Sequence, residues 1–240
     1  IATDVSGSML AKDLKPNRLE SLKKVAANFV NDRPNDRFGI VVYAAESYTK
    51  TPVTSDKSIV IDAIKSINYD NVLKDGTGIG MGLATAVNRL KDSKAKSRVI
   101  ILLTDGVNNA GFIEPETASQ IAKEYGIKVY TIGIGTNGMA EFPYAYAPNG
   151  NGFLFKMMPV EIDQELMKTI AKNTGGKYFR ASSNSKLEEI YNEINKLETT
   201  EIEELKFYDY DEKYRPFVWI AGILVLIEFG LRNTVFRSFI

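Results

Sequence analysis

The sequence predicts an α/β protein built on a doubly wound, mostly parallel sheet, and three observations lead to this fold class. Apolar runs of strand length alternate along the chain with segments whose apolar residues recur at helical spacing. The runs 38–44, 99–103 and 127–134 are almost continuously apolar, as strands covered on both faces are. The 240 residues also leave room for one such domain plus an appendage.

Composition narrows the possible functions. Lysine plus arginine and aspartate plus glutamate both total 30, so no overall field favours nucleic acid. The chain has no histidine and no cysteine, which removes disulfides, Cys/His zinc sites and Cys/His or Ser/His/Asp catalysis. We therefore expect no nucleic-acid partner and no small-molecule substrate.

The first strand is expected to lie in the centre of the sheet and to be about five residues long. Only three residues precede Asp4, so we expect the protein to begin upstream of Ile1.

The first half of the chain is predicted to contain a helix at 18–31, a strand at 38–44, an edge strand around Pro52, and helices from 55 and at 80–90. Proline is permitted on an edge strand, where its missing N–H is not needed. The residues predicted to face the core from these helices are Leu19, Leu22, Val25, Ala26, Phe29, Ile59, Ile61, Ile64, Ile67, Met81, Leu83, Ala84 and Val87.

The second half is predicted to alternate in the same way. Strands are expected at 99–103, 127–134 and 177–180, and helices from 114, at 162–173 and at 187–197. These elements complete a domain over residues 1–198.

The segment 136–159 interrupts this alternation. It is rich in aromatic residues, and Asn149-Gly150 is a strong hairpin-turn signal, so we expect an inserted two-stranded hairpin. The aromatic residues suit a docking surface, and they equally suit an insert that packs on its own domain.

The C-terminal part is predicted to be a connector at 199–215, a transmembrane helix at 216–236 and a tail at 237–240. Residues 217–227 carry no charge, but a span needs about 20 residues and therefore includes Glu228 and Arg232. These two stand four residues apart and could pair on one helical face. The alternative is a buried C-terminal helix of the core.

Five oxygen-bearing side chains are candidates for a metal site. Asp4, Ser6 and Ser8 lie on one turn, which could also be an ordinary turn because Asp and Ser favour turns. Thr77 lies on a glycine-rich loop before a helix, and Asp105 ends the strand at 99–103. Loops leaving the carboxyl ends of parallel strands meet in one crevice, so these donors can converge. Hard oxygen donors indicate Mg²⁺, with Ca²⁺ or Mn²⁺ possible.

The same glycine-rich loop, with Gly76, Gly78 and Gly80, invites comparison with a phosphate-binding loop. The Lys-Ser/Thr pair of a P-loop is missing and no clear strand precedes the loop, so we do not expect nucleotide binding.

In these motifs the chain resembles the von Willebrand factor A domain, a Rossmann-like fold, and its metal-ion-dependent adhesion site. That site has the pattern Asp-x-Ser-x-Ser, then a Thr, then an Asp, matched here by Asp4, Ser6, Ser8, Thr77 and Asp105. The resemblance implies that the serines and the threonine reach the metal and that the aspartates bind it directly or through water. It also implies that one coordination position is left for an acidic residue of a partner.

A narrower resemblance, to the bacterial aerotolerance BatA family, covers essentially the whole chain. The stretches that carry it are 105–109, 128–135, 174–181 and 231–237. It implies a membrane-anchored protein of the bacterial envelope. Basic residues flank the predicted span on both sides, and for the orientation we expect an inner-membrane anchor with the soluble domain on the periplasmic side. The implied partners are other Bat-type von Willebrand factor A membrane proteins, a MoxR-type AAA+ ATPase and the lipid bilayer, in a complex linked to stress tolerance.

The first functional hypothesis is therefore a non-catalytic, Mg²⁺-dependent protein-interaction module. One rival is a phosphoryl-transfer enzyme with Asp4 as the nucleophile. In such an enzyme the residue two positions after the nucleophile has to be a general acid. That position is Ser6, which cannot serve near neutral pH. A second rival is a cell-surface adhesin, which shares the metal chemistry and differs in its partner.

Overall fold

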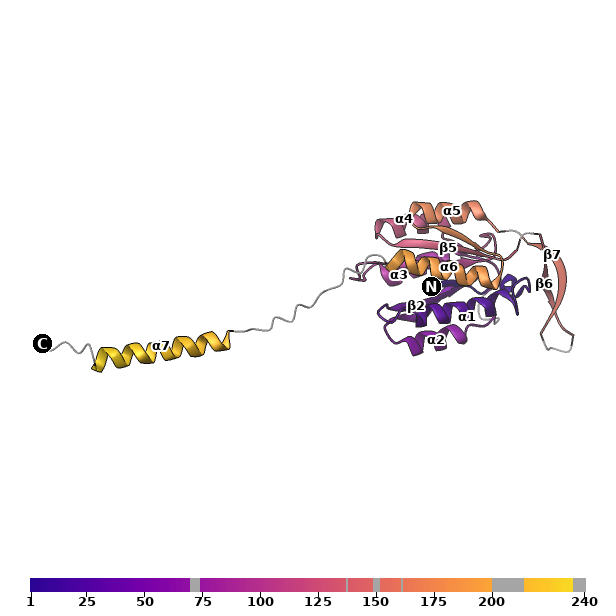
Figure 1. Cartoon of the computed structure of the whole chain (residues 1–240). Coiled ribbons are helices and arrows are strands. Elements are labelled where there is room, and N and C mark those ends of the chain that lie inside the picture. Colours follow the sequence, from indigo (N-terminus) through magenta and orange to yellow (C-terminus); the bar gives the residue numbers. More distant parts are fainter. Residues whose placement is uncertain (70–73, 137, 149–151, 161, 200–213, 235–240) are drawn as a thin grey trace. The chain divides into compact units, whose positions relative to one another are not determined.

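The computed structural model describes residues 1–69, 74–136, 138–148, 152–160, 162–199 and 214–234. The chain divides into two compact units, Ile1–Thr200 and Glu201–Ile240 (Figure 1). The first unit contains a six-stranded sheet in the order β3-β2-β1-β4-β5-β8, in which only the pair β2–β3 is antiparallel. The strands are β1 (Ala2–Asp4), β2 (Phe38–Tyr43), β3 (Ser47–Thr54), β4 (Val99–Thr104), β5 (Lys128–Ile134) and β8 (Tyr178–Ala181). The predicted α/β class with a mostly parallel sheet is confirmed.

Helices cover both faces of this sheet. They are α1 (Arg18–Asn31), α2 (Lys57–Lys65), α3 (Ile79–Leu90), α4 (Pro115–Glu124), α5 (Gln164–Asn173) and α6 (Asn184–Thr199), with a short 3-10 helix η1 (Gly7–Leu10) after β1. Apolar residues of α1, α2 and α6 share one buried cluster, and those of α3, α4 and α5 share the other.

Alternating side chains of each strand enter the two clusters. In β2, Ile40 and Val42 belong to the first cluster, while Val41 and Tyr43 belong to the second. Successive side chains of a strand point to opposite faces. A strand buried on both faces therefore has no solvent-facing positions, which is why the runs at 38–44 and 99–103 are almost continuously apolar.

Two helices differ from prediction in the residues that they bury. Ile59 is 53% exposed, whereas Val60 and Ile64 are buried. The Asp56 side chain caps α2 by accepting from the N–H groups of Ser58 and Ile59, which fixes the start of the helix. The core-facing stripe consequently begins at Val60, and Ile59 turns toward solvent.

In α3 the difference is similar. Ile79, Leu83, Ala86 and Val87 are buried, while Met81 and Ala84, which were predicted to face the sheet, are only half-buried.

The glycines at 78 and 80, one just before α3 and one in its first turn, are explained by packing. A Cβ added at Gly80 would lie 1.9 Å from the carbonyl oxygen of Ile113, and one at Gly78 would lie 2.9 Å from that of Ala44. Backbone approaches the loop this closely at both positions, so no phosphate ligand is needed to account for the glycines.

Replacing Gly80 by alanine is therefore expected to lower the free energy of unfolding by about 1–3 kcal/mol, because a backbone carbonyl must move. The helix-propensity gain of about 1 kcal/mol offsets only part of this cost. Urea denaturation measures the effect. Gly7→Ala is the control, since its Cβ would meet the nearest atom at 3.7 Å, an ordinary contact. Equal stability of Gly80→Ala and the unsubstituted protein would contradict the packing argument.

The interrupting segment forms a separate two-stranded antiparallel sheet, β6 (Gly138–Tyr146) and β7 (Phe153–Val160). The predicted turn at Asn149-Gly150 lies outside the described residues. Figure 1 shows this hairpin projecting from the body of the first unit. Its base contacts the loop after η1: the Lys12 N–H donates to the Glu141 carbonyl at 3.1 Å, and the Lys12 ammonium lies 3.5 Å from the centre of the Phe155 ring.

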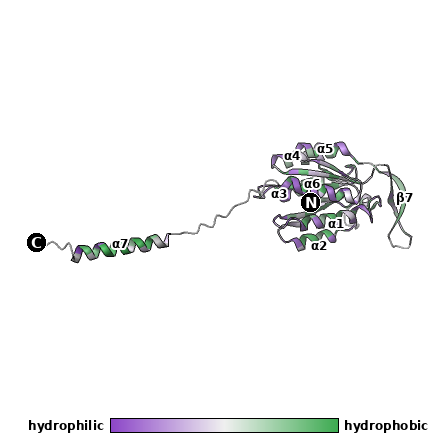
Figure 2. Ribbon diagram, in the orientation of Figure 1, coloured by the Kyte–Doolittle hydropathy of each residue, from purple (hydrophilic) through white to green (hydrophobic). Residues whose placement is uncertain are grey.

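The second unit contains α7 (Arg215–Thr234). Its described side chains, 217–232, are all exposed, and Figure 2 shows that most of the visible side of the helix is hydrophobic. Glu228 and Arg232 are the charged residues among them. Within the described ranges, no helix is both long enough and apolar enough to cross a membrane. The membrane-spanning helix at 216–236 is thus not confirmed and stays a prediction.

Candidate metal centre

The five candidate ligands lie where the strand order of the sheet reverses. Asp4 is the last residue of β1, and Asp105 follows the last residue of β4, the neighbouring strand. The chain leaves β1 toward β2 on one side and returns to β4 on the other, so the loops from the two carboxyl ends separate at this point. Such switch points are where open α/β sheets bind ligands. The topology alone therefore brings together residues that are about 100 positions apart in the sequence.

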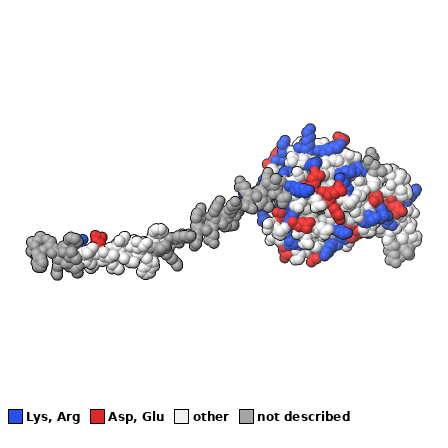
Figure 3. Space-filling view, viewed as in Figure 1, with Lys and Arg blue, Asp and Glu red and all other residues white. Residues whose placement is uncertain are grey.

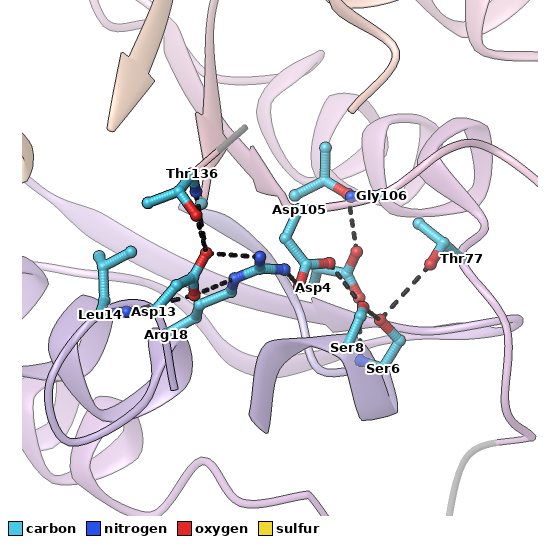
Figure 4. Close-up of polar contacts among 12 residues, drawn as sticks. Asp4, Ser6, Ser8, Asp13, Leu14, Arg18, Thr77, Asp105, Gly106 and Thr136 are labelled. Carbon is cyan, nitrogen blue, oxygen red and sulfur yellow. Dashed lines mark hydrogen bonds and ion pairs between the residues drawn. The ribbon is translucent and has the colours of Figure 1, made fainter. Parts of the chain in front are cut away.

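The side chains form one contiguous hydrogen-bonded cluster, drawn in Figure 4. Ser8 Oγ donates to Asp105 Oδ1 at 2.6 Å, and the hydroxyls of Ser6 and Ser8 lie 2.8 Å apart. Thr77 Oγ1 donates to Ser6 Oγ at 3.4 Å. Because Ser8 gives its proton to Asp105, the donors run in one direction from Thr77 through the serines to the carboxylate. We call these five side chains the oxygen cluster.

Asp4 joins the oxygen cluster through its own neighbours. Its Oδ1 accepts from the Ser6 N–H at 2.9 Å, and its Oδ2 accepts from Thr104 Oγ1 at 2.7 Å. Thr104, which the sequence did not single out, therefore fixes the orientation of the Asp4 carboxylate.

Burial makes the two carboxylates electrostatically costly. Asp4 is 0% and Asp105 is 2% exposed. Burial, and secondly repulsion by Asp105, raise the pKa of Asp4 to about 7, against hydrogen bonds from Ser6 and Thr104 that favour the charged form. Burial also raises the pKa of Asp105, although Arg18 and Ser8 oppose this. A bound cation would relieve this unfavourable charge.

The chemistry of the donor set fits a hard divalent cation. Every side chain of the oxygen cluster offers oxygen, three of them as neutral hydroxyls, and Mg²⁺ prefers such ligands. Groups of three or more His, Cys, Asp or Glu side chains that could hold a metal are absent from the described residues. A metal bound here would depend on the hydroxyls of Ser6, Ser8 and Thr77 and not on carboxylates alone.

A buried arginine that the sequence pattern does not single out lies beside the oxygen cluster. Arg18 Nη1 contacts Asp105 Oδ2 at 2.6 Å, while its Nε and Nη2 each contact Asp13 at 2.7 Å. Arg18 is fully buried, so its positive charge is balanced by these two carboxylates and not by solvent. One signal was available: a basic residue in the first turn of a helix opposes the helix dipole. Arg18 occupies that position in α1, which calls for a local carboxylate partner.

Asp13 extends this network toward the hairpin. It accepts from the Thr136 N–H at 2.8 Å and from the Thr136 hydroxyl at 3.2 Å, two residues before β6 begins. Burial alone would raise the pKa of Asp13, but its bonds to Arg18 and Thr136 hold the pKa below the ordinary value. Gly135 has a φ of +127°, and a Cβ there would lie 2.6 Å from Arg18 Nη2. The guanidinium thus occupies space that any side chain at 135 would need.

Two asparagines after β4 position Thr77. The side-chain oxygen of Asn109 accepts from the Thr77 N–H at 2.8 Å, and that of Asn108 accepts from the Ile79 N–H at 2.9 Å. Ile79 begins α3, so Asn108 satisfies a free N–H at this helix end. The Thr77 hydroxyl is thereby held toward Ser6 from the opposite side of the site.

The oxygen cluster opens into a cleft of about 350 Å³. We call it the hairpin cleft. It is lined by Ser6, Gly7, Ser8, Tyr69, Asp75, Gly76, Thr77, Asn109, Phe142, Pro143, Tyr144, Ala145, Tyr146 and Phe153. Three cluster hydroxyls are therefore at one side of a cleft whose other side is formed by the hairpin.

The fold and this switch-point site define a known class of domain. The family model for the von Willebrand factor type A domain matches residues 1–193, and the chain belongs to this family.

Among curated relatives, an uncharacterised protein of Borreliella burgdorferi is 29% identical over 230 residues, which is 95% of this chain and 67% of that protein. A UPF0353 protein of Mycolicibacterium paratuberculosis is 30% identical over 207 residues, which is 81% of this chain and 58% of that protein. The chain thus spans about two thirds or less of the length of these relatives.

Solved structures also resemble this chain. An aerotolerance-related membrane protein from Bacteroides fragilis superposes with a TM-score of 0.69 at 28% identity, covering 80% of this chain and 94% of the other. BatB from Bacteroides thetaiotaomicron gives 0.69 at 32% identity, covering 82% and 96%. The proximal thread matrix protein of the mussel byssus, with a zinc-occupied metal-ion-dependent adhesion site, gives 0.60 at 25% identity, covering 81% and 43%. The likeness supports a Bat-type von Willebrand factor A domain and does not distinguish BatA from BatB.

Proposed function

We propose that this chain is a non-catalytic, Mg²⁺-dependent protein-interaction module of a bacterial membrane complex. The oxygen cluster holds the ion, and a carboxylate of a partner protein completes its coordination. The observation that carries the proposal is the convergence of Asp4, Ser6, Ser8, Thr77 and Asp105 from three distant loops, with the hydroxyl-bearing residues Ser6, Ser8 and Thr77 lining one cleft.

Neutral ligands suit this role. The hydroxyls of Ser6, Ser8 and Thr77 contribute no charge, and Arg18 offsets the charge of Asp105. An ion held mainly by neutral oxygens keeps its attraction for an external anion. Mg²⁺ prefers octahedral coordination and accepts carboxylates readily, so an acidic side chain is the fitting ligand; Ca²⁺ and Mn²⁺ are the alternatives.

The arrangement around Asp4 argues against the phosphoryl-transfer alternative. A nucleophile must reach its substrate, yet Asp4 is fully buried and both its oxygens accept hydrogen bonds. Ser6, two residues on, contacts Ser8 through a hydroxyl that is no general acid near neutral pH.

The setting of the module is part of the proposal. One protein similar to this chain is described as an aerotolerance-related membrane protein and another as BatB, which supports a Bat-type membrane complex, and we assign this complex to the inner membrane. Apart from Glu228 and Arg232, the described side chains of α7 at 217–232 are uncharged and exposed, which suits contact with a bilayer. We place the first unit on the periplasmic side, with other Bat-type proteins and a MoxR-type ATPase as partners. A cell-surface adhesin would share the metal site and differ in this setting.

The test compares the same substitution at two buried threonines. Thr77→Val is expected to weaken Mg²⁺ binding at least tenfold, roughly the loss seen when a group that supports a metal site is removed. Thr131→Val is the matched control, because Thr131 is also buried but its hydroxyl donates to the Met167 carbonyl of α5, outside the oxygen cluster. Calorimetric titration with Mg²⁺ measures the affinity, and EDTA supplies the metal-free baseline. Equal Mg²⁺ affinity in Thr77→Val and the unsubstituted protein would rule out the proposed ligand set.

A further inference from the structure

The hairpin cleft joins two chemically different surfaces. On one side lie the hydroxyls of Ser6, Ser8 and Thr77, and on the other lie aromatic residues of the hairpin. Its volume of about 350 Å³ is at the low end for ligand pockets, which suits a short peptide segment. A group that reaches the oxygen cluster through this cleft must therefore pass the hairpin.

The aromatic side of the cleft is assembled before any partner arrives. The ring of Phe153 lies 5.4 Å from that of Tyr69 in an edge-on arrangement and 4.7 Å from that of Tyr146. The hydroxyls of Tyr69 and Tyr146 are hydrogen-bonded to each other. Tyr69 comes from the segment after α2, so this contact ties the hairpin to the body of the unit. We call Tyr69, Tyr146 and Phe153 the aromatic wall.

Part of the aromatic wall remains open to a ligand. Tyr146 is 55% exposed although it packs on Phe153. An aromatic ring that is already positioned loses little conformational freedom on binding, and an apolar or aromatic side chain can pack on its exposed part.

The charge of the cleft restricts which acidic partners fit. Asp75 is the charged side chain among the lining residues that the structure describes, and its Oδ1 lies 3.5 Å from the N–H of Gly7 in the metal-binding turn. A second carboxylate beside the one on the ion would approach Asp75 and be repelled. A run of acidic residues is therefore a poorer ligand than a single one.

We propose that the hairpin cleft selects a peptide segment in which one acidic residue is followed by an aromatic or large aliphatic residue. The carboxylate binds at the oxygen cluster, and the neighbouring side chain packs on the aromatic wall. This inference rests on the proposed function, because the carboxylate needs the ion. The inference adds that the β6–β7 hairpin contacts the residue next to the acidic one and so contributes to specificity.

The test uses the full chain in detergent and three fluorescent peptides, blocked at both ends and identical except for an Asp-Phe, Asp-Gly or Asp-Asp pair. In Mg²⁺ the Asp-Phe peptide is expected to bind about five- to tenfold more tightly than Asp-Gly, the gain that one aromatic contact brings. The Asp-Asp peptide is expected to bind no better than Asp-Gly. Anisotropy titrations with Mg²⁺ and with EDTA give the affinities.

Two variants on the hairpin assign the preference to the aromatic wall. Tyr146→Ala is expected to bring Asp-Phe to the affinity of Asp-Gly and to leave Asp-Gly unchanged. Met157→Ala is the matched control: Met157 is 51% exposed on the same hairpin but does not line the cleft, so the preference should persist. Asp75→Asn is expected to strengthen Asp-Asp several-fold by removing the repulsion.

The outcomes separate the two claims. Mg²⁺-dependent binding of Asp-Phe and Asp-Gly with equal affinity would overturn the role of the hairpin and leave the proposed function standing. The same holds if Tyr146→Ala keeps the full preference. Absence of Mg²⁺-dependent binding for all three peptides would overturn both.

Discussion

Replacing Arg18 by methionine is expected to lower the free energy of unfolding by about 3–5 kcal/mol, the cost of removing one partner from a buried ion pair. Methionine retains much of the aliphatic volume but leaves Asp13 and Asp105 without their shared cation. The side chains of these residues are 5% and 0% exposed, so water cannot replace the guanidinium. Asp4, a further buried carboxylate, adds to the uncompensated charge. Urea denaturation in EDTA measures the loss without a contribution from metal.

An exposed ion pair supplies the control for this substitution. Lys168 pairs with Glu165 at 2.7 Å, with side chains 52% and 85% exposed, so Lys168→Met is expected to leave the free energy of unfolding almost unchanged. Combining Arg18→Met with Asp105→Asn should recover part of the stability, because one uncompensated charge disappears. A loss below about 1 kcal/mol for Arg18→Met alone would show that the network is not an essential part of the fold.

Replacing Asp4 by asparagine is expected to stabilise the metal-free protein near pH 8, by up to about 4 kcal/mol. The pKa of Asp4 is raised from 3.8 to about 7 in the folded protein. Between these values the folded state holds a proton that the unfolded state has released, so stability contributed by this group is lost as pH rises from about 4 to about 7. Asparagine cannot ionise, and its amide can keep the contacts to Ser6 and Thr104. The unsubstituted protein and the variant should therefore diverge steadily over this pH range in EDTA.

Mg²⁺ should offset a large part of this difference in stability. A ligand at 100 times its dissociation constant stabilises the state that binds it by about 2.7 kcal/mol. The unsubstituted protein gains this near pH 8, while Asp4→Asn, lacking the carboxylate, gains little. Chemical denaturation at several pH values, with EDTA and with Mg²⁺, measures both effects. If Asp4→Asn in EDTA were less stable than the unsubstituted protein near pH 8, the buried charge of Asp4 would not be the liability described here.

The elements of the first unit could be predicted largely from local patterns. The helix predicted at 18–31 is α1, and the runs at 99–103 and 127–134 are β4 and β5, within a residue or so at each end. A strand buried on both faces and a helix with one buried face have different apolar periods, so each element identifies itself within about ten residues. Ile59 is a position where the local pattern does not decide which side chain is buried. Ile59, Val60 and Ile61 offer three neighbouring apolar positions, and the cap at Asp56 together with the packing of α2 decides which one is buried.

The candidate site was predictable only in part. Asp4, Ser6, Ser8, Thr77 and Asp105 carry a recognisable pattern of oxygen donors, and parallel topology implies that they meet. Arg18, Asp13 and Thr104 carry no such pattern. Each is an ordinary polar residue whose role depends on a contact with a residue far away in the chain or across a turn. A buried ion network is defined by the distances between its charged groups and by their exclusion from water. Neither property can be deduced from the spacing of residues along the chain.

The amino-acid sequence by itself determined the order and type of the elements and supplied the oxygen-bearing side chains that we propose as metal ligands, because periodicity and side-chain chemistry are local properties. Only the tertiary structure decided that Arg18 neutralises Asp105, that glycines 78 and 80 serve close backbone packing, and that the hairpin forms one side of the cleft beside the oxygen cluster. These features depend on which side chains share a volume from which water is excluded. Which side chains come together in this way follows from the order of the strands in the sheet, and strand order is a property of the whole domain.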